Sequence, residues 1–113
     1  MQNSGPEAYS HLGRKIIFIM TDTQRTDMVG CYGHPDMKTP AIDSLAAKGV
    51  RYEGAFSGQP VCGPARSAIF TGLYPHSNGS WANSIPLGAN VKTVGQRLRD
   101  NRFHTAYIGK YHL

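Results

Sequence analysis

Residues 62–72 combine a cysteine, a proline, an arginine and a Thr-Gly pair at close spacing, in the order Cys-Gly-Pro-Ala-Arg-Ser-Ala-Ile-Phe-Thr-Gly. Cys62 precedes a predicted helix and lies four residues before Arg66. A helix N-terminus and a nearby cation both lower the pKa of a thiol, so Cys62 is a candidate nucleophile. The alternative is a buried structural cysteine in a tight turn made by Gly63 and Pro64.

Polar side chains also follow two predicted strands. The continuous apolar run of residues 15–21 predicts a fully buried strand, and Asp22 comes directly after it. Lys110 and His112 follow a second predicted strand at 103–108. Because open parallel sheets bind ligands at the carboxyl ends of their strands, these three residues are candidates for a binding site. Taken singly, Asp22 would only start a turn, and the lysine and histidine would only be solvated.

The segments between these residues alternate between helix and strand signals. Thr39 before Pro40 predicts a helix start, and Gly49 predicts its end. The predicted elements are a strand at 15–21, a loop at 23–40, a helix at 40–48, a strand at 50–57, a loop at 57–64, a helix at 65–71, an irregular connection at 74–89, a helix at 93–100 and a strand at 103–108. This order predicts an α/β fold with a largely parallel sheet flanked by helices.

Composition narrows the class of protein. The chain has 113 residues, 40% of them apolar and 17% charged, which is typical of a globular domain. No apolar run approaches a membrane span, and two cysteines without metal-ligand spacing predict neither a disulfide framework nor a zinc site. The net charge of +5 suits an anionic substrate. The one basic cluster, Arg97, Arg99 and Arg102, has no nucleic-acid motif beside it and is predicted to be a solvated helix face.

Residues 1–14 are predicted to be an N-terminal leader segment. They lack the charged start and apolar stretch of a secretory signal, which predicts a cytoplasmic protein; the alternative is a periplasmic or secreted protein whose signal was removed. Three predicted strands make a thin sheet, so we expect residues 15–113 to be the N-terminal part of a larger, truncated domain.

Four segments, in order, resemble one family. The Cys62 segment resembles the sulfatase signature Cys-x-Pro-x-Arg followed by Thr-Gly. Residues 17–22 resemble that family's first strand, which ends in an acidic metal ligand, and residues 39–56 resemble its first helix and second strand. Residues 109–113 are similar to Gly-Lys-Trp-His-Leu, with Tyr111 in place of Trp. The chain is therefore identified as a member of the sulfatase family, which implies an alkaline-phosphatase-like fold.

The resemblance implies a role for each matching residue. Cys62 would be converted to formylglycine by a formylglycine-generating enzyme that reads Pro64 and Arg66. One hydroxyl of the hydrated aldehyde would attack sulfur, and the other would then expel sulfate as the aldehyde reforms. Arg66 would hold the ionised formylglycine, Lys110 would bind sulfate oxygens, and His112 would contact the nucleophile or assist its proton transfers.

The resemblance also implies a divalent metal, with calcium as the first choice and magnesium or manganese as alternatives. Asp22 and the modified Cys62 would be ligands, and a carboxylate suits such a hard cation. Many members have a second Asp directly after the first, whereas this chain has Thr23 and Gln24. Either Thr23 or Gln24 would coordinate through a neutral oxygen, which leaves the site with one negative charge fewer.

The implied function is hydrolysis of a sulfate ester. A phosphonate monoester hydrolase or phosphodiesterase of the same superfamily is the first alternative. Such relatives can also carry a non-acidic residue after the first Asp, where this chain has Thr23. A non-catalytic fragment or binding domain is the second, because later acidic, Asn and His residues complete the family's site. We expect the 113 residues alone to be inactive.

Overall fold

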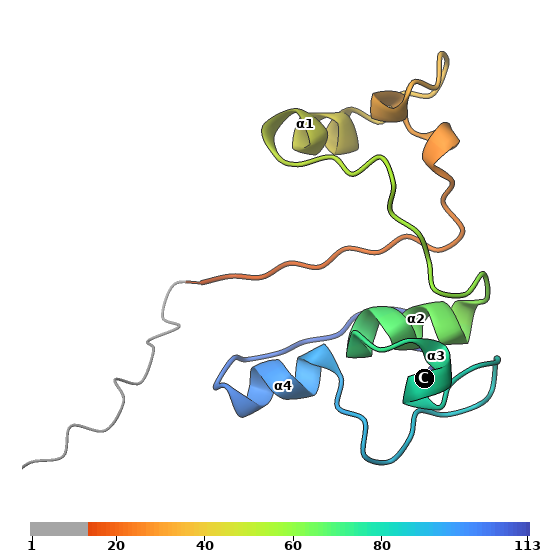
Figure 1. Cartoon of the computed structure of the whole chain (residues 1–113). Coiled ribbons are helices and arrows are strands. Elements are labelled where there is room, and N and C mark those ends of the chain that lie inside the picture. Colours follow the sequence, from red (N-terminus) through yellow and green to blue (C-terminus); the bar gives the residue numbers. More distant parts are fainter. Residues whose placement is uncertain (1–13) are drawn as a thin grey trace, which may run out of the picture. The chain divides into compact units, whose positions relative to one another are not determined.

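The computed structural model describes residues 14–113, which fall into two compact units. Lys15–Ala55 form the first, called here the N-terminal unit, and residues 56–113 belong to the second, the C-terminal unit. Figure 1 colours the first from red to yellow-green and the second from green to blue. The predicted leader at 1–14 lies outside the described residues except for Arg14.

The N-terminal unit contains two short 3-10 helices, η1 (Thr26–Met28) and η2 (Gly30–Tyr32), and one α-helix, α1 (Pro40–Lys48). As predicted, α1 begins at Pro40 and ends before Gly49, whose N–H donates to Leu45 O. The segment 23–40, predicted to be a loop, contains the two 3-10 helices η1 and η2.

A side-chain cluster joins η2 to α1. Thr39 occupies the predicted N-cap position but makes no capping hydrogen bond with its side chain. Its hydroxyl accepts from Gly30 N (2.9 Å) and donates to Asp43 Oδ1 (2.9 Å), which also accepts from Cys31 N (2.8 Å). A Cβ on Gly30 would lie 2.9 Å from Asp43 Oδ2 and 3.1 Å from Met37 O, so a larger residue would have to displace the Asp43 carboxylate.

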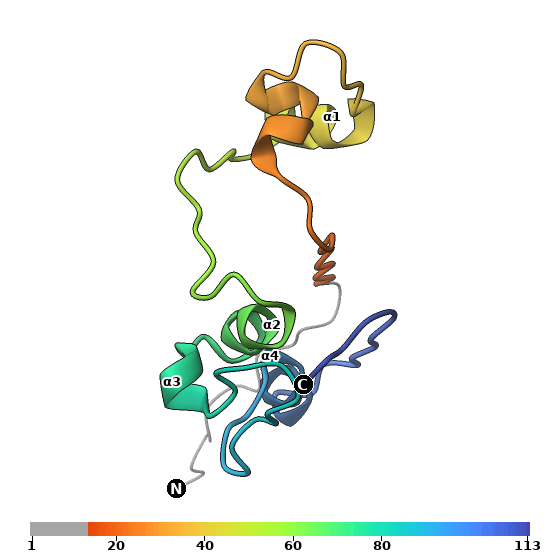
Figure 2. The same ribbon diagram turned by 90° about the vertical axis from the view of Figure 1, so that its right-hand side faces the viewer.

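The C-terminal unit contains three α-helices, α2 (Cys62–Thr71), α3 (Pro75–Asn78) and α4 (Val94–Asp100). Helices α3 and α4 both pack against α2, as Figures 1 and 2 show. Helix α2 ends where Gly72 adopts φ +71°, a conformation that glycine reaches without a Cβ clash. Helix α4 begins with a capping box in which Thr93 and Gln96 exchange side-chain and backbone hydrogen bonds.

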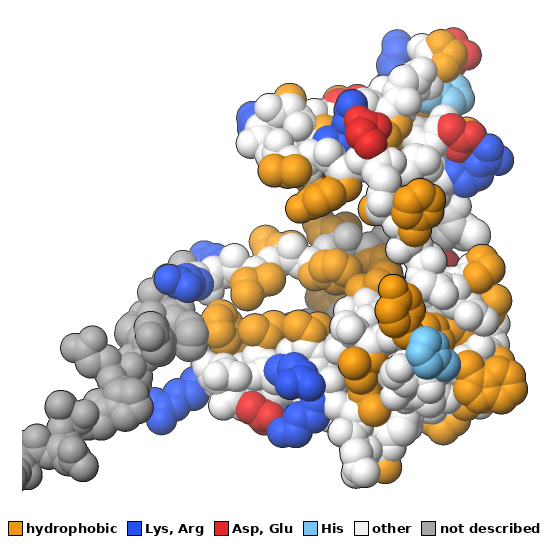
Figure 3. Space-filling model, in the orientation of Figure 1, with side chains coloured by type: hydrophobic (Ala, Val, Ile, Leu, Met, Phe, Trp, Pro, Cys, Tyr) orange, Lys and Arg blue, Asp and Glu red, His pale blue; other side chains and the backbone are white. Residues whose placement is uncertain are grey.

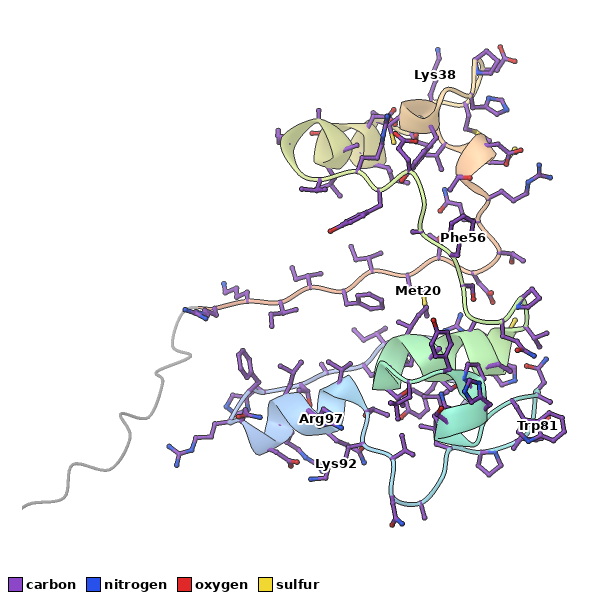
Figure 4. The ribbon with its side chains drawn as sticks, viewed as in Figure 1. Met20, Lys38, Phe56, Trp81, Lys92 and Arg97 are labelled. Carbon is purple, nitrogen blue, oxygen red and sulfur yellow. The ribbon has the colours of Figure 1, made fainter. Side chains whose placement is uncertain are left out.

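Two boundaries in this unit differ from the prediction. Helix α2 begins three residues earlier than expected, so Cys62 is its first residue. The connection at 74–89 contains α3, because Pro75 starts a helical turn and Gly79, at φ +90°, ends it. The predicted solvated face of α4 is confirmed for Arg97, labelled in Figure 4, and for Arg99, which are both exposed. Arg102 is also exposed, but it lies after the helix, at φ +65°.

The predicted strands are not formed between residues 14 and 113. Segments 15–21, 50–57 and 103–108 have no strand assignment, and Ile17 and Ile108 are 81% and 97% exposed. The hydrophobic side chains along the extended segment after the grey residues lie open to solvent in Figure 3. A buried strand needs a hydrogen-bonded neighbour and cover on both faces, and no described segment supplies them. The predicted parallel sheet is thus absent from the described residues.

Packing in the C-terminal unit centres on α2. Phe70 is buried and contacts the rings of Tyr107 (centroids 5.7 Å apart) and Tyr111 (6.0 Å). The buried residues of α2 are Gly63, Pro64, Arg66, Ser67 and Phe70.

No helix in the described part of the chain is long and apolar enough to cross a bilayer.

Candidate nucleophile site

Cys62 lies at the N-terminus of α2, where backbone N–H groups lack partners within the helix. The helix dipole makes this end electropositive, which favours anions. Cys62 is half-buried and forms no disulfide with Cys31, the other cysteine among the described residues. The structure therefore places the Cys62 side chain where negative charge is stabilised.

Asn83 closes the turn beside Cys62. Its Oδ1 accepts a hydrogen bond from Gly63 N (2.9 Å), which is one of the N–H groups without an acceptor inside α2. A Cβ on Gly63 would lie 3.1 Å from Asn83 Oδ1 and 3.7 Å from His112 O. The segments that carry Asn83 and His112 therefore both pass close to this glycine. Sequence reasoning missed Asn83, because nothing distinguishes it from the other polar residues of an irregular connection.

Arg66 is buried, at 6% exposure, and its Nη1 donates to Lys110 O (2.6 Å). Arg66 therefore does not lie on the surface of the helix. A buried guanidinium must be paired or hydrogen-bonded, and this bond ties α2 to the segment carrying Lys110 and His112.

The 109–113 segment turns sharply against α2. Gly109 has φ +110° and His112 has φ +60°, both in the left-handed region. The structure thus brings the backbones of Lys110 and His112 to the first turns of α2, through Arg66 and Gly63 respectively. Both side chains are exposed.

Three of the four predicted metal ligands lie in the N-terminal unit. Asp22, Thr23 and Gln24 are exposed, and Thr23 has φ +58°, which is rare for a β-branched residue. Their donors are all oxygen atoms, which suit a hard cation. Among residues 14–113, however, no three His, Cys, Asp or Glu side chains come together as a metal site. Since Cys62 belongs to the other unit, its role as a shared ligand stays a prediction.

Two aromatic residues after α2 are exposed. Tyr74 stacks on His76 with ring centroids 5.7 Å apart. Trp81, labelled in Figure 4, projects from the loop after α3, and its carbonyl accepts from Gln59 Nε2 (3.2 Å). The aromatic rings of Tyr74 and Trp81 therefore do not pack in the interior of this unit.

Comparison with known proteins gives one consistent answer. The family model "Sulfatase" matches residues 14–113. An uncharacterized sulfatase of Escherichia coli K12, YidJ, is 50% identical over 98 residues, covering 87% of this chain and 20% of the relative. Human steryl-sulfatase is 38% identical over 120 residues, covering 95% of this chain and 21% of the relative. The chain therefore belongs to the sulfatase family.

Two further relatives differ in the chemistry their names give. N-acetylglucosamine-6-O-sulfatase of Bacteroides thetaiotaomicron is 36% identical over 98 residues, covering 87% of this chain and 18% of the relative. The crystal structure of a phosphonate monoester hydrolase of Agrobacterium radiobacter is 34% identical with a TM-score of 0.66, over 70% of this chain and 16% of that one. The chain spans about a fifth of the length of the curated relatives it matches.

Proposed function

We propose that the protein containing this chain is a sulfuric ester hydrolase whose nucleophile is formylglycine made from Cys62. One observation carries the proposal: the first residue of α2 is the cysteine of a complete Cys-x-Pro-x-Arg motif, in a chain that matches the sulfatase family from residue 14 to 113. The proposal includes a formylglycine-generating enzyme as the partner that converts Cys62.

The hydrated formylglycine explains hydrolysis in two balanced steps. One of its hydroxyls forms a bond to sulfur while the bond from sulfur to the alcohol oxygen breaks, and the alcohol leaves with a proton. The second hydroxyl then loses its proton, the carbon–oxygen bond to sulfate breaks, and the aldehyde reforms. Addition of water to the aldehyde regenerates its two hydroxyls. The electropositive N-terminus of α2 favours the negative charge present in both steps.

The proposed roles of the other residues follow from charge and position. Lys110 binds sulfate oxygens, and His112 contacts the nucleophile or moves its proton. Arg66 holds the ionised nucleophile and, through its bond to Lys110 O, keeps the anion-binding segment against α2. In these roles, the fold would place polar and positively charged side chains where negative charge develops in the transition state.

We include a divalent cation, calcium first, held by Asp22 and the modified Cys62 with neutral oxygens from Thr23 and Gln24. Such a cation would polarise the sulfate and favour the ionised hydroxyl. The left-handed conformation of Thr23 supports a functional segment here, because backbone strain gathers at binding sites. We also propose that residues 15–21, 50–57 and 103–108 pair as parallel strands in the full-length protein.

The test compares ester classes on the full-length protein. We expect turnover of an aryl sulfate, its loss in Cys62→Ala, and its loss on chelation with recovery on adding calcium. Turnover unchanged in Cys62→Ala would contradict the nucleophile, and turnover unchanged by chelation would contradict the metal.

Phosphonate monoester hydrolysis is the second candidate. The similarity to a phosphonate monoester hydrolase favours it, as does Thr23 in place of a second acidic residue. The two candidates differ in the ratio of kcat/KM for an aryl sulfate to that for an aryl phosphonate. A ratio above one supports the sulfatase, and a ratio below one supports the second candidate.

A further inference from the structure

The carbonyl oxygen of Lys110 accepts hydrogen bonds from two residues. Arg66 Nη1, from α2, lies 2.6 Å away, and the hydroxyl of Tyr107 lies 2.5 Å away. A carbonyl oxygen has two lone pairs, so these two donors occupy both. The position of the Lys110 backbone is therefore set jointly by α2 and by the Tyr107 side chain.

This backbone needs an anchor, because its conformation is unfavourable at His112. Gly109 (φ +110°) and His112 (φ +60°) flank Lys110 and Tyr111. The left-handed conformation is unfavourable for a non-glycine residue such as His112, because the Cβ then lies too close to the following carbonyl oxygen. Such conformations persist only where surrounding contacts determine them, and the bonds to Lys110 O are contacts of this kind.

The Tyr107 ring is itself held by packing. It meets Phe70 edge-on at 5.7 Å and Tyr111 edge-on at 5.2 Å, and Phe70 is buried on α2. This packing restricts the ring, so its hydroxyl is held at Lys110 O at a low cost in entropy. The hydroxyl of Tyr111, in contrast, makes no hydrogen bond within residues 14–113.

We propose that Tyr107 is a positioning residue whose hydroxyl holds Lys110 in place as an anion ligand. This inference rests on the proposed function, in which Lys110 binds sulfate. Losing the hydroxyl should weaken anion binding while the aromatic packing, and with it the fold, is kept.

The test uses two matched substitutions in the full-length protein, Tyr107→Phe and Tyr111→Phe. Each removes one hydroxyl from the same aromatic cluster, but only Tyr107→Phe removes a hydrogen bond to Lys110. The probe is inorganic sulfate, whose binding is measured by calorimetry and by inhibition of aryl sulfate turnover. We expect Tyr107→Phe to weaken sulfate binding about fivefold, the loss of one hydrogen bond. Tyr111→Phe should stay within about twofold of wild type, at an equal Tm.

A second comparison ties the effect to Lys110. In a Lys110→Ala background, Tyr107→Phe should cause no further loss of sulfate affinity, because the side chain it positions is gone. Equal sulfate affinity in the two tyrosine variants would overturn the inference, as would the same fivefold loss in the Lys110→Ala background. Sulfate binding without any turnover of sulfate esters would instead contradict the proposed function, and calorimetry would still test Tyr107.

Discussion

The carboxamide of Asn78 donates a hydrogen bond to the hydroxyl of Ser67 at 3.0 Å, with both side chains almost fully buried at 1% and 0% exposure. The Asn78 amide nitrogen also donates to Leu73 O (3.2 Å), and Asn78 Oδ1 accepts from Ser80 N (2.9 Å). Ser67 in turn donates to Pro64 O (2.8 Å), in the first turn of α2. One buried amide thus connects α3 and its flanking loops to the helix that carries Cys62.

Replacing Asn78 by Ala should destabilise the protein by about 1–3 kcal/mol, because buried partners lose their hydrogen bonds. Ser80 N loses its acceptor, and Leu73 O loses a donor. Asn90→Ala, at an exposed position, is the matched control and should change the unfolding free energy by less than about 0.5 kcal/mol. Urea denaturation of the full-length protein measures both, and equal midpoints for the two variants would show that the buried network is not stabilising.

The burial of the motif predicts when Cys62 can be modified. Pro64 and Arg66, which the modifying enzyme is proposed to read, are both buried within folded α2. We therefore expect conversion of the unfolded chain and of a peptide spanning residues 52–75, but not of folded protein made without the enzyme. Conversion appears as a loss of about 18 Da in the tryptic peptide 52–66. Conversion of the folded protein as fast as the peptide would contradict this order of events.

Local signals predicted the boundaries of α1 and the start of α4 well. Pro40 and Gly49 bound α1, and Thr93 begins α4, since a proline, a glycine and a capping hydroxyl act within one helical turn. The start of α2 was missed by three residues, because Gly63 and Pro64 predict a turn although Pro is tolerated in the first helical turn.

Long-range contacts could not be predicted in this way. Arg66 is buried because Lys110, 44 residues later, supplies an acceptor, and Asn83 reaches Gly63 across 20 residues. The apolar run at 15–21 predicts a buried strand, but a strand forms only where a neighbouring strand pairs with it. Motifs identify the candidate site residues, whereas the geometry of those residues depends on tertiary contacts.

Asp43 should control the local stability of η2. Its Oδ1 accepts from the backbone of Cys31 and from the hydroxyl of Thr39. In Asp43→Ala we therefore expect faster hydrogen exchange at the Cys31 amide, whose partner is removed. Asp36→Ala, an exposed carboxylate in the loop before α1, is the control and should leave that amide unchanged. Unchanged exchange in Asp43→Ala would show that another group protects the amide.

Two helix glycines should respond in opposite ways to alanine. In Gly95, a Cβ would meet nothing nearer than Thr93 Oγ1 at 3.9 Å, so Gly95→Ala should stabilise α4 by about 0.5–1 kcal/mol. In Gly63, a Cβ would lie 3.1 Å from Asn83 Oδ1, which must move and weaken its bond to Gly63 N. We expect Gly63→Ala to lack this stabilisation and to lower kcat/KM about fivefold by shifting the Cys62 turn.

The mass of the Cys62 peptide is the control. Because the motif accepts any residue after the cysteine, Gly63→Ala should still be converted normally, and a lower kcat/KM then reflects a changed turn and not a failure of modification. Equal gains in Tm and unchanged kcat/KM in both variants would show that Asn83 does not constrain this turn.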